Sequence, residues 1–127
     1  MGGNSLKILL VDDEKFILKM YQTKLEQAGY YVETASSGKD AVSRAKEDHP
    51  DLIFLDIVMG NMDGLEALKQ LKKDPATKNV PVFMLTNIVS ERDKKEALNL
   101  GAAGYCIKTD TEPADLLQVA NRFAHHA

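Results

Sequence analysis

Residues 51–64 read DLIFLDIVMGNMDG, and this stretch decides how the chain is expected to fold. Four apolar residues, 52–55, run directly into Asp56. A short apolar run bounded by polar and turn residues predicts a strand that is buried on both faces of a parallel sheet. Asp56 then stands at the carboxyl end of that strand, where open α/β sheets bind their ligands. A carboxylate at that place is a helix cap, a metal ligand or a nucleophile.

The segments on either side of this strand predict alternating strands and helices. Predicted strands occupy residues 6–11, which form an apolar run, residues 30–35, which alternate weakly, and residues 81–85 and 103–107. Helical patterns occupy residues 14–28, 37–47 and 65–72, and two more helices begin near Ser90 and Pro113. Five strands alternating with five helices, without an internal repeat or linker, predict an α/β fold, a doubly wound parallel sheet in a single domain. We expect the flavodoxin-like order 2-1-3-4-5, because so short a chain has room for one switch point.

The helices also show which side chains should face the core and where the helices should end. The predicted inward residues are Ile17, Tyr21, Leu25 and Ala28; Ala41, Val42 and Ala45; Leu65, Leu68 and Leu71; and Leu116, Leu117, Ala120 and Phe123. The fourth helix is charged along most of its length and apolar only near Ala97, Leu98 and Leu100. Gly29 and Gly101 are predicted to end the first and fourth helices. Ser90, with Asp93 three residues on, resembles a capping box, and Thr111 is a candidate cap for the last helix.

The composition is that of an ordinary folded domain. Of the 127 residues 44% are hydrophobic and 28% charged, which argues against disorder. A formal net charge of −3 provides no general attraction to nucleic acid or to anionic membranes. The apolar runs are of strand length and the first residues lack a secretory or myristoylation pattern, so no membrane attachment is predicted. The single cysteine, Cys106, excludes an internal disulfide, suits a reducing cytoplasm and is expected to be a buried strand residue.

Polar residues follow several of the predicted strands at one end of the sheet. In the expected order the carboxyl ends of strands one and three are neighbours, so Asp12, Asp13 and Asp56 should converge. Thr86 ends strand four and Lys108 ends strand five, on the same rim. Taken singly, each has a structural explanation, since an aspartate can cap a helix and the other two can be turn and surface residues. Together they predict a functional site.

The residue types at this rim indicate the chemistry of the site. Three crowded carboxylates repel one another, and a cation would hold their charged forms together. Hard oxygen ligands without a histidine or cysteine cluster indicate Mg²⁺ or a similar ion. Zinc is not expected, because His49 lies between elements and His125 and His126 lie at the C-terminus. A small hydroxyl and a lysine that face the carboxylates indicate a phosphoryl group between them.

The whole chain, residues 1–127, resembles the receiver domain of two-component response regulators, with a core over about residues 6–123. The resemblance rests on an ordered set of features rather than on any single one. They are the acidic pair Asp12-Asp13, Asp56 followed by Met59, Asp63 and Gly64, then Thr86, the segment GAAGY at residues 101–105, and Lys108 three residues beyond Tyr105. The resemblance implies the same doubly wound fold and a phosphorylation-switched signalling domain.

The resemblance also implies how the site would work. Asp56 would be the phosphoacceptor, which attacks a phosphohistidine and becomes an acyl phosphate. Asp13 would bind Mg²⁺ directly and Asp12 mainly through water, with Asp56 and the backbone carbonyl of Val58 as further ligands. Lys108 would pair with Asp56 at rest and with a phosphoryl oxygen after transfer. The ion would neutralise charge as the phosphoryl group passes between donor and acceptor.

The switch and the partners are implied in the same way. Thr86 would turn its hydroxyl to the phosphoryl group and Tyr105 would move inward with it. This movement would change the surface of helix four, strand five and helix five. The donor would be a sensor histidine kinase or a histidine phosphotransfer protein in the cytoplasm, and a dimer after phosphorylation is conceivable. The domain would assist its own phosphotransfer and dephosphorylation without being a turnover enzyme, and its output partner is open.

Three positions depart from the usual pattern of this family. Gly60 stands where a proline usually follows the methionine, so that loop is expected to be more mobile. Asn87 follows the threonine where a smaller residue is usual, and it could restrict the access of water or donor to the site. Thr109 follows the lysine where the family usually has proline, so a cis peptide bond there would be costly. Rates of phosphorylation and dephosphorylation are therefore open.

Three other classes of protein share part of this pattern. A flavodoxin would carry a phosphate-binding loop after strand one, but Asp12 and Asp13 would repel the phosphate of FMN. A haloacid-dehalogenase-type phosphatase would have a second aspartate at position 58, which is Val58. A pseudo-receiver, which binds partners without being phosphorylated, is the remaining alternative, although the complete residue set argues against it.

Two surface features have both a structural and a functional explanation. Phe16 is expected to point away from the apolar face of the first helix, either as an incidental exposed residue or as a docking point for the phosphodonor. The charged run 91–96 is expected to be a solvated helix face or part of an output surface.

Overall fold

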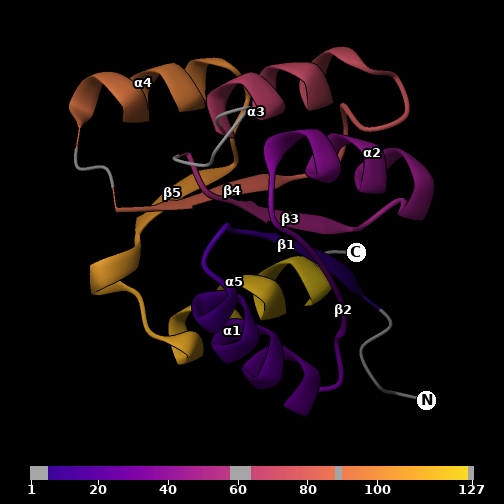
Figure 1. The fold of residues 1–127 in the computed structure, drawn as a ribbon, viewed down its shortest axis with the longest axis vertical. Coiled ribbons are helices and arrows are strands. Elements are labelled where there is room, and N and C mark those ends of the chain that lie inside the picture. The colour runs from indigo at the N-terminus through magenta and orange to yellow at the C-terminus, as the bar shows by residue number, and fades with distance from the viewer. Residues whose placement is uncertain (1–5, 58–63, 88–89, 126–127) are drawn as a thin grey trace.

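A five-stranded parallel sheet forms the centre of the molecule (Figure 1). The computed structural model describes residues 6–57, 64–87 and 90–125. The strands are β1 (Lys7–Val11), β2 (Tyr31–Ala35), β3 (Leu52–Leu55), β4 (Val82–Thr86) and β5 (Gly104–Ile107). Their order, β2-β1-β3-β4-β5, confirms the predicted doubly wound sheet.

Helices follow the strands in alternation, within one or two residues of their predicted bounds. They are α1 (Lys15–Gln27), α2 (Gly38–Asp48), α3 (Gly64–Lys73), α4 (Glu91–Asn99) and α5 (Pro113–His125). A short 3₁₀ helix, η1 (Lys108–Asp110), follows β5 and was not predicted. None of the helices in the described part of the chain has the length and apolar character needed to cross a bilayer.

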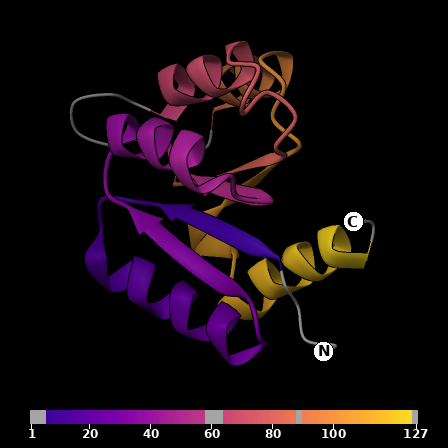
Figure 2. The ribbon, with the colours of Figure 1, turned by 90° about the vertical axis from the view of Figure 1, so that its right-hand side faces the viewer.

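The sheet is covered on both faces, as Figure 2 shows, with α1 and α5 on one side and α2, α3 and α4 on the other. Successive side chains of a strand point to opposite faces, so each central strand supplies both cores. The core beneath α1 and α5 includes Ile8, Leu10, Leu52, Phe54, Leu116 and Val119. The opposite core includes Leu9, Val11, Ile53, Leu55, Ala41 and Leu68. This double burial explains why β1 and β3 read as continuous apolar runs.

The predicted inward residues of α1, α2, α3 and α5 are either buried or half-buried against one of the two cores. In α1, Tyr21 and Leu25 are buried, Ile17 and Ala28 are half-buried against the core, and Leu18 is buried as well. In α4 Ala97 is buried, whereas Leu98 is 44% exposed, because the next residue along a helix is turned away by about 100°. In α3, Leu65 is half-buried, while Leu68 and Leu71 are buried as predicted and Ala67 joins them.

The helix ends follow the predicted chemistry except in α5. The Ser90 hydroxyl accepts a hydrogen bond from the backbone N–H of Asp93 at 3.3 Å, as the sequence predicts. Gly101, at φ 108°, lies in the left-handed region where glycine is favoured and follows the end of α4. The prediction that Thr111 caps α5 was wrong, since its hydroxyl donates to the carbonyl of Ile107 at 2.7 Å. Cys106 lies in β5 as predicted but is only half-buried, because β5 is an edge strand.

Candidate functional site

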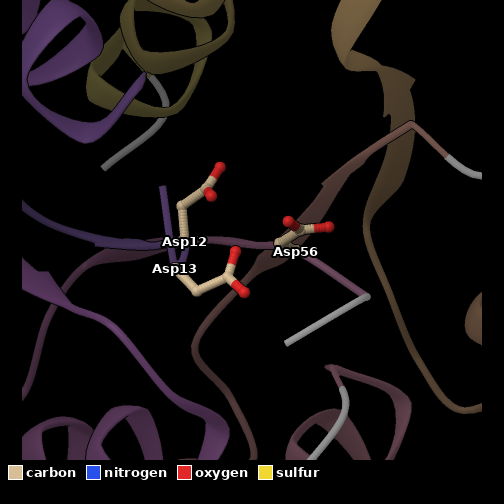
Figure 3. A group of neighbouring side chains, drawn as sticks. All are labelled: Asp12, Asp13 and Asp56. Carbon is tan, nitrogen blue, oxygen red and sulfur yellow. The ribbon is translucent and has the colours of Figure 1, made fainter. Parts of the chain in front are cut away.

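The carboxyl ends of β1 and β3 lie side by side and bring three aspartates together. The backbone N–H of Asp56 donates to the carbonyl of Val11 at 3.1 Å, which continues the pairing of the two strands. Carboxylate oxygens of Asp12, Asp13 and Asp56 lie within 4.8 Å of one another, and Figure 3 shows the three groups gathered at the strand ends. Asp12 and Asp56 are each 4% exposed, whereas Asp13 is open to solvent. The predicted convergence is confirmed.

Lys108, which follows β5, reaches this cluster from the far side of β4. Its Nζ lies 2.5 Å from Oδ2 of Asp12 and 2.9 Å from Oδ2 of Asp56. The lysine is itself buried, and burial alone would lower its pKa. The hydrogen bonds to the two carboxylates outweigh burial and hold the pKa of Lys108 well above its ordinary range. The ammonium is therefore charged and fixed between two buried anions.

Asp12 is held by more than the lysine. Its Oδ1 accepts a hydrogen bond from the backbone N–H of Glu14 at 2.9 Å, which shapes the turn between β1 and α1. Burial raises the pKa of Asp12, and the contacts with Lys108 and with the N–H of Glu14 offset part of that effect. A buried carboxylate with a raised pKa at the edge of a sheet is typical of functional sites.

Glu14 is a neighbour of the site that the sequence analysis did not single out. Its Oε1 lies 3.2 Å from Nζ of Lys108, although its side chain is 57% exposed. Its position directly after Asp12 and Asp13, at the end of the same strand, is the sequence feature that could have indicated Glu14 as a site residue. Lys108 thus contacts three carboxylates rather than the single one expected.

Thr86 and Tyr105 lie on the neighbouring strands of the same rim. Thr86, fully buried, is the last residue of β4, which separates β3 from β5. Tyr105 is half-buried in β5 on the side of the sheet that α4 covers. Burial raises the pKa of Tyr105, and the charges of Asp93 and Asp56 add to the rise. Asn87, directly after Thr86, is exposed.

The loop between β3 and α3 is described only at its two ends. The predicted roles of Val58 and Gly60 fall on residues outside the described ranges. At the far end of the loop the N–H of Gly64 donates to the carbonyl of Ile57 at 2.7 Å. A Cβ on Gly64 would lie 1.9 Å from the backbone oxygen of Asp56, so only glycine fits there without moving the backbone. Peptide bonds in the described ranges, including the one between Lys108 and Thr109, are trans.

The donor set fits a hard divalent cation. Three carboxylates offer oxygen atoms close enough to share one ion, and carboxylate oxygen is the ligand that Mg²⁺ prefers in proteins. Two of the three are buried, where crowded negative charges gain most from a cation. The site residues therefore combine a carboxylate cluster that fits a metal ion, a charged lysine and a buried hydroxyl on one rim.

Comparison with known proteins identifies the class to which this fold and site belong. A sequence model described as the response regulator receiver domain matches residues 8–121, and the chain belongs to that family. Among solved structures, the chemotaxis protein CheY4 of Vibrio cholerae superposes with a TM-score of 0.86 at 35% identity, covering 94% of this chain and 98% of that one. The CheY of a Borrelia burgdorferi complex with CheX, BeF₃ and Mg²⁺ has a TM-score of 0.84 at 30% identity, with 93% and 89% covered.

Curated relatives are longer proteins. The transcriptional regulatory protein PhoP of alkaline phosphatase synthesis in Bacillus subtilis is 44% identical over 102 residues, which are 80% of this chain and 42% of PhoP. The response regulator PleD of Caulobacter vibrioides is 36% identical over 104 residues, 82% of this chain and 23% of PleD. The chain thus spans less than half the length of these relatives.

Proposed function

We propose that this receiver domain accepts a phosphoryl group from a phosphohistidine on Asp56. One observation carries the proposal: Asp56 is a buried carboxylate at a strand end, 2.9 Å from the ammonium of Lys108 and beside two other carboxylates. A carboxylate oxygen of Asp56 attacks phosphorus, the bond from phosphorus to the imidazole nitrogen breaks, and the imidazole leaves with its electron pair and takes up a proton. The product is an acyl phosphate, so the charge of the phosphoryl group moves into the rim.

The residues around Asp56 have separate tasks in this transfer. Lys108 balances the charge of the carboxylate before transfer, and its ammonium lies where it can then bond a phosphoryl oxygen. Thr86 offers a hydroxyl from the neighbouring strand end for a second oxygen. These groups orient the phosphoryl group and stabilise its charge, and they do so from strand ends that are already fixed.

Asp12, Asp13 and Asp56 would hold Mg²⁺ in this site, with the backbone carbonyl of Val58 as an expected further ligand. When bound, the ion supplies positive charge that offsets the developing charge on the transferring phosphoryl oxygens. Asp13 is the residue we expect to bind the ion directly, since its carboxylate is open to solvent. Asp12 is already engaged by Lys108 and by the N–H of Glu14, which suits contact through water.

The response to phosphorylation would pass through Thr86 and Tyr105 to the surface formed by α4, β5 and α5. Thr86 ends β4, Tyr105 lies in β5 beneath α4, and the two strands pair directly. A hydroxyl drawn to the phosphoryl group leaves space that the half-buried Tyr105 can enter, which links one added charge to an outer surface. That surface would recognise an output domain or partner, and the phosphodonor would be a cytoplasmic histidine kinase or phosphotransfer protein.

Intact-mass measurement tests the central step. We expect one added phosphoryl group after incubation with Mg²⁺ and phosphoramidate or acetyl phosphate, and none on Asp56→Asn, which keeps the shape of the side chain but not its nucleophile. Removal of Mg²⁺ with a chelator should abolish the adduct on the wild type. The absence of an adduct with several donors would favour a pseudo-receiver, and an equal adduct on Asp56→Asn would place the chemistry elsewhere.

A further inference from the structure

Thr111 closes the turn that carries Lys108, directly after the last residue of β5 that pairs with β4. After β5 the chain turns through η1, and the side chains of Thr109 and Asp110 in that turn face solvent, so packing contributes little to its shape. The N–H of Thr111 donates to the carbonyl of Lys108 at 3.1 Å, and its hydroxyl donates to the carbonyl of Ile107 at 2.7 Å. Thr111 thus closes the turn through both its backbone and its side chain.

Thr111 is in turn tied to α1 by Tyr21. The phenol hydroxyl of Tyr21 donates to the backbone carbonyl of Thr111 at 3.1 Å, across 90 residues of sequence. Tyr21 is 3% exposed and belongs to the core beneath α1 and α5, so its ring has a fixed position. A hydroxyl anchored in the core therefore sets where the turn after β5 lies.

These contacts close a ring around one ion pair. Lys108 contacts the carboxylate of Asp12, Asp12 leads through the turn at Glu14 into α1, and α1 carries Tyr21. Tyr21 holds Thr111, and Thr111 holds the backbone of Lys108. Such a ring matters because a lysine side chain is long and flexible and loses rotamer entropy when it is fixed. Its anchoring point decides which carboxylates the ammonium can reach.

We propose that Tyr21 and Thr111 are positioning residues for Lys108, which fix its ammonium between Asp12 and Asp56. Neither residue needs to touch the phosphoryl group, since each acts through the backbone of the turn. The predicted effect on phosphotransfer rests on the proposed function, whereas the predicted effect on the position of the Lys108 ammonium does not. Two measurements distinguish these effects.

The first measurement follows the Lys108 ammonium directly by NMR of ¹⁵N-lysine-labelled protein, with its signal assigned by loss in Lys108→Arg. In Thr111→Val and in Tyr21→Phe we expect the signal to shift toward that of exposed lysines or to broaden through faster exchange with water. Thr111→Ser keeps the hydroxyl and should keep the wild-type signal. Thr109→Val, which removes an exposed hydroxyl from the same turn, is the matched control and should change nothing. A wild-type signal in both folded variants, Thr111→Val and Tyr21→Phe, overturns the proposal.

The second measurement is the rate of phosphorylation by phosphoramidate. Thr111→Val and Tyr21→Phe should each lower it roughly 10-fold, because small displacements of a charge-stabilising group are costly in transfer reactions. In a Lys108→Ala background the same substitutions should have no further effect, since the group on which they act is gone. A further loss in that background contradicts action through the lysine. If the wild type takes no phosphoryl group, the proposed function fails, and the NMR comparison still decides the positioning role.

Discussion

Nζ of Lys108 lies 2.9 Å from Oδ2 of Asp56, although the two residues follow β5 and β3 and β4 runs between those strands. The lysine spans the end of β4, where Thr86 is buried. The strand ends therefore hold a fixed positive charge directly beside the buried carboxylates of Asp12 and Asp56. This arrangement suits an anionic group attached to Asp56, because the compensating charge is in place before that group arrives.

Removal of the Lys108 ammonium should destabilise the fold. Lys108→Met leaves Asp12 and Asp56 buried without their cation, and we expect the free energy of unfolding to fall by about 2 kcal/mol or more, as for other broken buried pairs. Urea unfolding at neutral pH measures the change. Lys46→Met is the matched control, since Lys46 pairs with Asp74 at 3.3 Å on the surface, and it should cost less than about 1 kcal/mol. Equal losses in the two variants would contradict the buried pairing.

Because of the same lysine, the free energy of unfolding should depend on pH in the alkaline range. Its carboxylate partners outweigh burial and raise the pKa of Lys108 above the ordinary value of 10.5. A raised pKa in the folded state means that the stabilisation is complete below the unfolded value and is lost as the pH rises through the folded one. The stability difference between wild type and Lys108→Met should stay constant from about pH 8 to about pH 10 and then shrink. A difference that grows above that range would refute the pairing.

Magnesium should stabilise the protein through the carboxylate cluster. At a concentration about 100 times its dissociation constant, an ion that binds only the folded state adds about 2.7 kcal/mol. We expect Mg²⁺ to raise the melting temperature of the wild type, and to do so much less for Asp13→Asn, which lacks the exposed ligand. Glu47→Gln removes an exposed carboxylate from α2 and should respond like the wild type. Equal stabilisation of all three proteins would indicate non-specific binding of the ion.

The sequence was sufficient for the strand order and for the meeting of the aspartates. Both depend on simple rules, since buried parallel strands read as apolar runs and their carboxyl ends share one rim. Asp12 and Asp56 could therefore be placed together without knowledge of any contact between them. Their closeness follows from the pairing of β1 with β3, which no side-chain detail alters.

The partners of Lys108 could be predicted only in part. Its pairing with Asp56 was implied by the family resemblance. Its contacts with Asp12 and Glu14 depend on the conformation of a long, flexible side chain, which the sequence does not specify. The hydrogen bond from Tyr21 to Thr111 joins residues that are far apart in sequence and leaves no periodic pattern. Threonine is common at helix starts, which is why the sequence predicts Thr111 as a cap, but its hydroxyl donates to the backbone carbonyl of Ile107 instead.

Gly64 should be indispensable to the position of Asp56. In Gly64→Ala the new Cβ would overlap the backbone oxygen of Asp56, so the end of β3 or the start of α3 must move. We expect a loss of about 2 kcal/mol or more in the free energy of unfolding, together with weaker Mg²⁺ binding. Urea unfolding and Mg²⁺ titration measure the two effects.

Gly101→Ala is the comparison for that variant, because it tests strain away from the rim. At φ 108° an alanine is strained by about 1 kcal/mol, and the atom nearest to its Cβ would be Cγ of Lys72, at 3.4 Å. Gly101→Ala should therefore lose stability while its affinity for Mg²⁺ stays at the wild-type level. Loss of Mg²⁺ affinity in both variants would show that general destabilisation, rather than displacement of Asp56, is responsible.

Phe16 offers a way to separate recognition of the phosphodonor from the chemistry at Asp56. Its side chain is 82% exposed in the first turn of α1, the helix that begins just after Asp12 and Asp13. If the donor protein docks there, Phe16→Ala should slow phosphotransfer from a histidine donor roughly 10-fold, as for the loss of a central contact residue. Phosphorylation by phosphoramidate, which needs no docking surface, should be unchanged.

Leu98→Ala provides the matched control for this prediction, since Leu98 is also a large apolar residue, 44% exposed, but lies on α4. It should leave transfer from the histidine donor at the wild-type rate. An equal loss of both reactions in Phe16→Ala would mean that the substitution disturbs the rim itself, through the turn that Asp12 and Glu14 form at the start of α1. An unchanged rate of transfer from the histidine donor would make Phe16 an incidental exposed side chain, and docking would then have to involve other residues near the aspartates.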